Sequence, residues 1–309
     1  MITVTDLSLQ IGSRTLYSDV NLKFTPGNCY GIIGANGAGK STFLKLLEGK
    51  MEPTTGSISM GPNERMSSLN QDHFAFEDFS VMETVIQGHQ KLYQVMKERD
   101  ALYAKADFSE EDGVKAAELE TEFAELDGWN AEADAAQLLQ SMSIPEDMHQ
   151  KQMSELAESD KVKVLLAQAL FGNPDILLLD EPTNGLDIPS KTILRSLLAA
   201  YADEKRTIVI STHQVREVEN LIDKIVILDE QGLVLAATTE ELSHRLTFGP
   251  LPADAKAIYS TPSFSGEEGI ALNTTGRESR PDLELIFAAT THDRTTIPSI
   301  LHTNPTNHE

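Results

Sequence analysis

The chain has 309 residues, a net charge of -23 and an apolar content of 40%, enough to bury one large core or two modest ones. The acidic excess argues against a general nucleic-acid surface and against DNA as a partner, because neutralising phosphates requires clustered lysine and arginine. The single cysteine excludes an internal disulfide, and no run approaches the ~20 apolar residues of a membrane span.

The charge is unevenly distributed along the chain. Residues 1–60 carry five basic and four acidic side chains, whereas residues 85–150 carry fifteen acidic and five basic ones. An acidic run of this kind is interpreted first as the solvated face of helices. The amino-terminal sequence alternates like a strand and lacks a signal-peptide profile. We therefore expect a cytoplasmic protein that reaches a membrane, if at all, through a partner.

The first half of the chain predicts strands followed by helices. Residues 2–33 favour strands separated by glycine-containing turns, and residues 57–60 favour one more short strand. A helix is expected from residue 42, and helical spacing of apolar residues predicts another over 81–106. Residues 107–140 predict an acidic helix, a break at 127–130 and a second helix from Ala131. We expect these last two helices to form a hairpin that projects from the core.

The second half alternates between helices and strands. The pattern predicts helices over 161–171, 189–202 and 214–222, and strands over 176–179, 207–211 and 224–228. Such alternation is typical of an α/β fold with a mostly parallel core sheet. Beyond residue 246 the chain becomes rich in Pro, Ser, Thr and Gly. We expect a main domain over residues 1–246 and a small α+β appendage over 247–309 that ends in a disordered tail.

One octapeptide determines the class of ligand. Residues 34–41 read GANGAGKS and match the phosphate-binding pattern G-x-x-x-x-G-K-[ST] between a predicted strand and a predicted helix. The glycines let backbone N–H groups point inward, and the following helix adds its positive end. Lys40 is expected to reach the β- and γ-phosphates and Ser41 to ligate Mg²⁺. The candidate nucleotide contacts are Gly34, Asn36, Gly37, Ala38, Gly39, Lys40, Ser41 and Thr42.

Three further residues complete a candidate catalytic centre. Asp180 and Glu181 follow four apolar residues and so lie at the end of a buried strand. Asp180 suits Mg²⁺ coordination, and Glu181 suits the polarisation of an attacking water. His213 follows the next strand, where it is expected to face the ligand and to donate to the γ-phosphate.

At this point the sequence resembles the ATP-binding cassette (ABC) family. The resemblance is carried by residues 34–41, a glutamine-containing loop at 70–72, ILLLDEP at 176–182, NGLD at 184–187 and STH at 211–213. It implies a P-loop NTPase cassette with an antiparallel β subdomain and an α-helical subdomain at about 81–160. It also implies that Gln71 senses Mg²⁺ and the γ-phosphate, and that His213 is a switch residue. ATP would lie between two cassettes, with Asp187 at their seam, so a homodimer or a partner cassette is expected.

Two positions depart from the family pattern. The signature sequence, usually LSGGQ, here reads LAESD at residues 156–160, with Leu156, Ala157 and Ser159 expected at the dimer seam. Glu158 would bring a carboxylate toward a γ-phosphate and slow hydrolysis. The aromatic residue expected to stack on adenine is replaced by Ile11, for which Tyr17 is a possible substitute.

The resemblance changes along the chain, as in a hybrid. Residues 1–182 resemble the first cassette of ABC-F proteins, which are soluble ATPases that act on ribosomes. The expected hairpin at 107–140 stands at the position where those proteins carry their arm insertion. Residues 184–290 resemble the ATPase subunit of a bacterial ABC transporter. Three functions therefore remain open: a ribosome-associated ATPase, the ATPase subunit of a membrane transporter, and a nucleotide-binding module that does not hydrolyse ATP.

Overall fold

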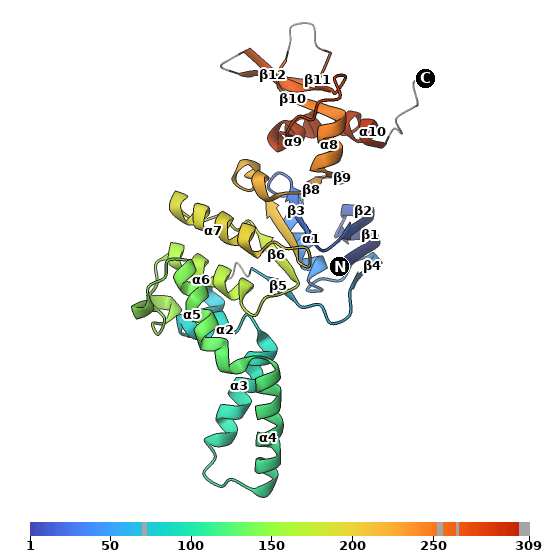
Figure 1. Ribbon diagram of the computed structural model, residues 1–309. Coiled ribbons are helices and arrows are strands. Elements are labelled where there is room, and N and C mark those ends of the chain that lie inside the picture. Colours follow the sequence, from blue (N-terminus) through green and yellow to red (C-terminus); the bar gives the residue numbers. More distant parts are fainter. Residues whose placement is uncertain (70–72, 252–255, 264–265, 303–309) are drawn as a thin grey trace. The chain divides into compact units, whose positions relative to one another are not determined.

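The computed structural model describes residues 1–69, 73–251, 256–263 and 266–302. This part of the chain divides into two compact units (Figure 1). Unit 1 comprises residues 1–64, 178–182 and 198–309, and unit 2 comprises residues 65–177 and 183–197. Among the described helices, none is both long and apolar enough to cross a bilayer.

A three-stranded antiparallel sheet begins unit 1. Its strands are β1 (Ile2–Ile11), β2 (Arg14–Phe24) and β4 (Thr55–Met60), in the order β2-β1-β4. Along β1, Val4 is buried before a register irregularity and Leu7 is buried after it. Asp6, with φ 48°, is the extra residue that shifts the alternation by one position. The bulge therefore keeps both halves of the strand facing the same core.

The larger sheet supports the phosphate-binding segment. Its order is β5-β6-β7-β3-β8-β9, and β3 pairs in parallel with both β7 and β8. These strands are β5 (Met66–Ser68), β6 (Ile176–Asp180), β7 (Thr207–Thr212), β3 (Asn28–Ile33), β8 (Lys224–Asp229) and β9 (Gly232–Thr238). All six residues of β7 are buried, as expected inside a parallel sheet. The carboxyl ends of β3 and β7 therefore lie at one edge, where α1 (Lys40–Leu47) begins.

The expected carboxyl-terminal α+β segment is also present in unit 1 (Figure 1). It contains α8 (Thr239–Arg245), β10 (Leu246–Pro250), β11 (Ala257–Ser263), β12 (Gly266–Leu272), α9 (Leu283–His292) and α10 (Thr296–His302). The strands pair in the order β10-β12-β11, and Leu283, Leu285 and Ile286 are buried. The domain boundary at residue 246 remains a prediction. Residues 303–309, where the sequence predicts a disordered tail, lie outside the described residues.

The prediction of a helix over residues 214–222 is wrong. The structure has two 3-10 turns there, η5 (Val215–Glu217) and η6 (Glu219–Leu221), separated at Val218. Val215, Val218 and Ile222 are all buried, a spacing that also fits an α-helix. Val218 instead has φ -127°, so the chain unwinds there and enters β8 in an extended conformation.

Unit 2 is predominantly helical. Its α-helices are α2 (Val81–Ile86), α3 (Gln90–Tyr103), α4 (Glu110–Glu125), α5 (Ala131–Ser141), α6 (Glu158–Leu170) and the start of α7 (Ile188–Tyr201). Short 3-10 turns are η1 (His73–Phe76), η2 (Gly128–Asn130), η3 (Glu146–Met148) and η4 (Met153–Glu155). The single helix expected over 81–106 is interrupted at Gly88. Any side chain there would meet the backbone carbonyl of Gln168, so the interruption lets α6 approach closely.

The predicted hairpin exists, but the sequence assigned it to the wrong pair of helices. α3 and α4 lie side by side and extend from the rest of unit 2, whereas α5 packs against α2 and α6 (Figure 1). Ser109 makes a capping box with Asp112 and so starts α4 on its return path. Asp127, in a left-handed conformation with φ 56°, then turns the chain toward α5. The break at 127–130 is therefore the base of the hairpin and not its tip.

Candidate functional site

The phosphate-binding segment lies between β3 and α1 in unit 1. Gly37 and Gly39 have φ of 84° and 96°, a region that favours glycine. A side chain at Gly34 would press on the carbonyl of Leu228. Gly39 occupies the N-cap position of α1 and makes no side-chain cap bond. The first-turn N–H groups of α1 are therefore left for a ligand that accepts hydrogen bonds, such as a phosphate.

Lys40 is held at the centre of this segment. Its ammonium donates to the carbonyl of Gly34 at 2.9 Å and to that of Ala35 at 3.3 Å. It also lies 3.2 Å from Oε1 of Glu181, and only 6% of the lysine side chain is exposed. The loop backbone therefore fixes a buried cation beside Glu181, whereas Asn36 and Ser41 are exposed.

Glu181 connects this cation to the histidine. Its Oε2 lies 2.7 Å from Nδ1 of His213, and the backbone N–H of His213 donates to the same oxygen. The N–H of Glu181 is fixed by both the carbonyl and the hydroxyl of Ser211. Glu181 has φ 46°, a left-handed conformation that costs a residue with a side chain roughly 1–3 kcal/mol. The surrounding hydrogen bonds therefore hold a strained residue in one orientation.

Asp180 lies beside this group, at the end of β6. The hydroxyl of Ser211 donates to its Oδ1, which orients the carboxylate. Carboxylate and hydroxyl oxygens are the protein ligands that Mg²⁺ prefers, usually together with substrate phosphates. The described residues contain no cluster of three or more His, Cys, Asp and Glu that could hold a metal ion by themselves. The carboxylate of Asp180 therefore suits a Mg²⁺ ion that arrives with a nucleotide, and the contact of Ser41 with that ion stays a prediction.

The candidate residues of the signature region belong to unit 2. The structure starts α6 at Glu158 rather than at residue 161, so Ser159 lies in its first turn. Ala157 is the N-cap and makes no side-chain cap bond, while Leu156 is buried. The exposed carboxylate of Glu158 lies 3.0 Å from the buried ammonium of Lys161. The negative charge expected at this helix start is therefore partly neutralised within the chain.

Two further candidate site residues, Asp187 and Gln71, have no described contact with the group around Glu181. Asp187 directly precedes α7, and hydrogen bonds from Ser190 lower the pKa of its carboxyl group. Gln71 lies outside the described residues, so its proposed contacts with Mg²⁺ and the γ-phosphate stay a prediction. The structure thus brings Lys40, Asp180, Glu181 and His213 together and leaves the relation of the signature residues to them a prediction.

The prediction that Tyr17 could substitute for the adenine-stacking aromatic residue is wrong. Its side chain is fully buried, packs edge-on against Phe43 and donates its hydroxyl to the carbonyl of Gly39. Burial raises the pKa of this phenol. Tyr17 therefore supports the phosphate-binding loop from the protein interior. Ile11 is half exposed, so its side chain is accessible to a ligand.

The supporting roles of two residues were not predicted from the sequence. Ser211 was identified only as part of a family motif, yet its hydroxyl joins Asp180 to the backbone of Glu181. Arg14 donates to the carbonyl of Gly37 at 3.4 Å. Neither role has a local sequence signal, because each depends on segments brought together by sheet pairing.

Comparisons with known proteins agree with this geometry. A family model described as ABC transporter matches residues 17–184. The uncharacterized ABC transporter ATP-binding protein YkpA of Bacillus subtilis is 54% identical over 229 residues, which cover 74% of this chain and 42% of YkpA. The uncharacterized ABC transporter ATP-binding protein MJ1023 of Methanocaldococcus jannaschii is 27% identical over 80% of this chain and 81% of its own length. The chain spans about two fifths of YkpA.

A solved structure supports the same fold. The dimeric post-hydrolysis state of the ATP-binding cassette MJ0796, bound to ADP and Pi, aligns with a TM-score of 0.58. The alignment covers 77% of this chain and 98% of that cassette at 20% identity.

Proposed function

The chain belongs to the ABC transporter family, and from this premise we propose that it is a soluble, ABC-F-like ATPase that associates with ribosomes. In this proposal two cassettes close around ATP, and hydrolysis reopens them. The observation that carries the ATPase chemistry is the contact of Glu181 with both Lys40 and His213.

The proposed chemistry assigns a role to each residue of this group. Lys40 exchanges the Glu181 carboxylate for β- and γ-phosphate oxygens. Glu181, still oriented by His213, then accepts a proton from the attacking water. His213 donates to the γ-phosphate through Nε2, the ring nitrogen that does not face Glu181. Ser41, Asp180 and Gln71 would hold Mg²⁺, which neutralises charge on the phosphates when bound.

The helical hairpin favours the ribosomal role. The α3–α4 hairpin follows the phosphate-binding segment and precedes the signature region, the position in which ABC-F proteins carry their arm. This position supports a protein that uses its helical unit to contact a large assembly.

Sedimentation with ribosomes tests this proposal. A Glu181→Gln variant should bind ATP without hydrolysing it, so we expect it to co-sediment with ribosomes in Mg·ATP and not in ADP. The matched control adds Lys40→Ala to the same variant and should abolish co-sedimentation. Equal amounts on ribosomes with ATP, with ADP and in the control would exclude the ribosomal role.

A transporter subunit is the second candidate. The observation that favours it is MJ1023, which matches this chain over most of both lengths and is named an ABC transporter ATP-binding protein. A transporter subunit should co-purify with an integral membrane protein, and the amount should fall after charge changes on the helical unit. Recovery only with soluble components would exclude this candidate.

A further inference from the structure

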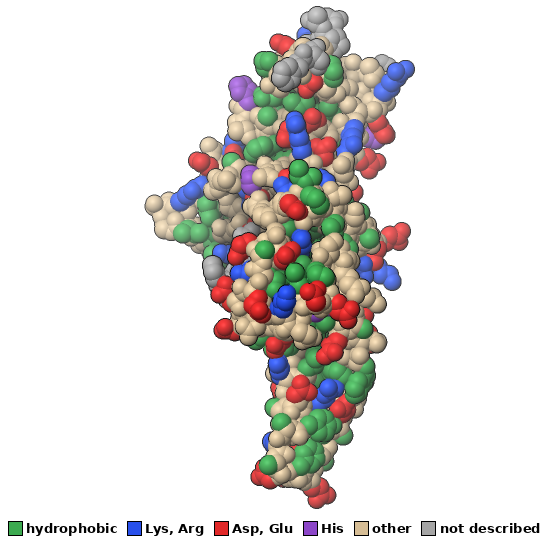
Figure 2. Space-filling model, turned by 90° about the vertical axis from the view of Figure 1, so that its left-hand side faces the viewer, with side chains coloured by type: hydrophobic (Ala, Val, Ile, Leu, Met, Phe, Trp, Pro, Cys, Tyr) green, Lys and Arg blue, Asp and Glu red, His purple; other side chains and the backbone are tan. Residues whose placement is uncertain are grey.

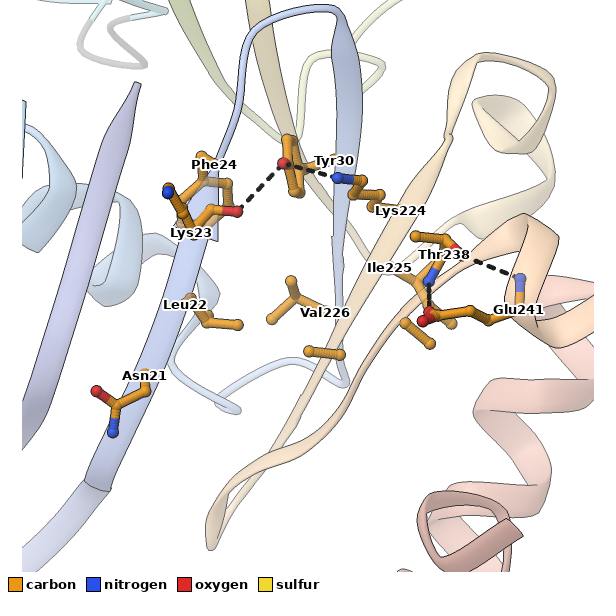
Figure 3. A pocket seen from close by; sticks show the side chains of 12 residues that line it. Asn21, Leu22, Lys23, Phe24, Tyr30, Lys224, Ile225, Val226, Thr238 and Glu241 are labelled. Carbon is orange, nitrogen blue, oxygen red and sulfur yellow. Dashed lines mark hydrogen bonds between the residues drawn. The ribbon is translucent and has the colours of Figure 1, made fainter. Parts of the chain in front are cut away.

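Unit 1 has a cavity away from the phosphate-binding segment, and two charged residues of its lining are already engaged within the protein. The cavity has a volume of about 220 Å³ and is formed by β2, β3, β8, β9 and α8 (Figure 3). Lys224 lies over the ring of Tyr30, and Glu241 accepts the N–H of Thr238 in a capping box. A polar contact that the proposed chemistry does not yet explain lies elsewhere in unit 1, next to His213.

The side chain of Gln214 lies between a histidine and a carboxylate. One end of its amide is 3.0 and 3.1 Å from the two carboxylate oxygens of Glu217. Because those oxygens accept hydrogen bonds and do not donate them, this end is the NH₂ group. The other end, 3.4 Å from Nε2 of His213, is therefore the amide oxygen. Gln214 thus donates to Glu217 and presents an acceptor to His213.

The 3-10 turn η5 brings Gln214 and Glu217 together. Gln214 is the N-cap of η5 and Glu217 is its last residue, and side chains three positions apart lie above one another in such a turn. The backbone of Gln214 is also fixed, because its N–H donates to the hydroxyl of Thr212 at 2.9 Å and its carbonyl accepts the N–H of Glu217. Carboxylates are numerous over the face that Figure 2 shows, so the charge of Glu217 alone indicates nothing, whereas its place in this turn does.

This contact completes a chain of polar groups that ends at the phosphate-binding loop. Nδ1 of His213 is 2.7 Å from Oε2 of Glu181, whose Oε1 is 3.2 Å from the ammonium of Lys40. The proton between Nδ1 and Oε2 belongs to that pair. Because an amide oxygen only accepts, Gln214 selects the form of the ring that also carries a proton on Nε2. The nitrogen that donates to the γ-phosphate in the proposed chemistry is therefore kept as a donor before a nucleotide binds.

We propose that Gln214 is a positioning residue for His213, an inference that rests on the role proposed for this histidine in hydrolysis. The amide oxygen of Gln214 holds the Nε2 proton in the nucleotide-free chain, and Glu217 holds the amide in the required orientation. When ATP binds, a γ-phosphate oxygen replaces the amide oxygen, because a charged acceptor forms the stronger hydrogen bond. ADP lacks that phosphate, so with ADP His213 stays bonded to Gln214.

Nitrogen NMR of the histidine rings in the nucleotide-free full chain tests this hydrogen bond, with the His213 signals assigned by their loss in His213→Asn. Nε2 of the unaltered chain should resonate as a protonated nitrogen. Gln214→Met keeps the length of the side chain and removes the acceptor, so the Nε2 signal should move toward that of an unprotonated nitrogen. The matched control Arg216→Met, which loses an exposed ion pair with Glu284 in the same turn, should leave the signal unchanged. An unmoved Nε2 signal in a folded Gln214→Met variant overturns the proposal.

Steady-state kinetics separate positioning from a purely structural role. Gln214→Met should lower kcat for ATP hydrolysis about fivefold, as expected for one lost hydrogen bond, while KM for ATP changes by less than about twofold. Arg216→Met should keep both constants, and melting curves establish that the two variants are folded. A displaced Nε2 signal with unchanged kcat would overturn the positioning role. Absence of turnover in the unaltered chain would count against the proposed function, whereas the NMR comparison decides the Gln214 contact by itself.

Discussion

Glu181 combines a strained backbone with a carboxylate that is only 10% exposed. Its left-handed conformation is kept by two hydrogen bonds from its N–H to Ser211, while the side chain contacts Lys40 and His213. Strain of this kind persists where surrounding contacts fix it, and it is concentrated at functional sites. The same contacts therefore explain both why the residue is strained and why its carboxylate is oriented for chemistry.

Tyr17 gives a prediction at the scale of one hydroxyl group. Tyr17→Phe removes one of two hydrogen bonds to the carbonyl of Gly39, which still accepts the N–H of Phe43, so the free energy of unfolding should fall by about 1 kcal/mol. Urea denaturation measures this loss. Because the ring does not contact a nucleotide, affinity for ATP should change less than threefold. A tenfold loss of ATP affinity at unchanged stability would contradict this prediction and would show that the hydroxyl of Tyr17 takes part in nucleotide binding.

Motif residues were the most predictable part of the site. The spacing of glycines, Lys40 and Ser41 specifies a loop whose geometry depends on local backbone, so the sequence alone indicates it. The burial of Tyr17 and the bond between Ser211 and Asp180 depend on how separate strands pair. A residue whose role is set by sheet register leaves no signal in its own neighbourhood.

Among the elements, α3 carries a pH-sensitive cap. Nδ1 of His89 accepts the N–H of Leu92, a bond that requires this nitrogen to be unprotonated. Burial, and then the nearby charge of Arg65, lower the pKa of His89 below its ordinary value. The native state thus prefers neutral His89, and its contribution is fully present above the unfolded pKa of ~6.5. This contribution to stability is lost as the pH falls from ~6.5 through the lower pKa that His89 has in the folded state.

We predict that the urea concentration at the midpoint of unfolding falls between pH 7.5 and pH 5. Loss of this cap accounts for part of the fall. His89→Asn supplies a capping oxygen that does not titrate, so its midpoint should fall less over the same range. The difference between the two proteins isolates His89 from other titrating groups. Identical pH dependence in both proteins would contradict the assignment.

The elements also show where periodicity stops being informative. The pattern at 107–140 correctly predicts two helices, but it does not determine which neighbour α4 packs against. Pairing with α3 follows from the turn before Ser109 and from the left-handed residue Asp127. At 214–222 the buried positions fit a helix, yet the need to enter β8 extended limits the segment to 3-10 turns. Tertiary connections decided both cases.

At the scale of the whole molecule, the departure in the signature region affects how two cassettes would work together. In the proposed dimer, Glu158 faces the γ-phosphate of the partner's ATP and lowers turnover. Replacing Ala157, Glu158 and Ser159 by Ser, Gly and Gly should raise steady-state phosphate release at least tenfold. Lys161 keeps Glu77 as an ion-pair partner in this variant, so unfolding is not expected. Unchanged turnover would show that the altered signature does not limit hydrolysis.

The central claim is that residues 34–41 bind Mg·ATP for hydrolysis by Glu181, and calorimetric titration with phosphate-release assays tests it most directly. Because Lys40 supplies the buried cation, the unaltered chain should bind Mg·ATP with a dissociation constant below ~1 mM, and Lys40→Ala should lose this binding. Lys45→Ala, on the same helix, should bind normally. Glu181→Gln should bind ATP and hydrolyse it at least 100-fold more slowly. A folded, unaltered chain without affinity for millimolar Mg·ATP would contradict the account.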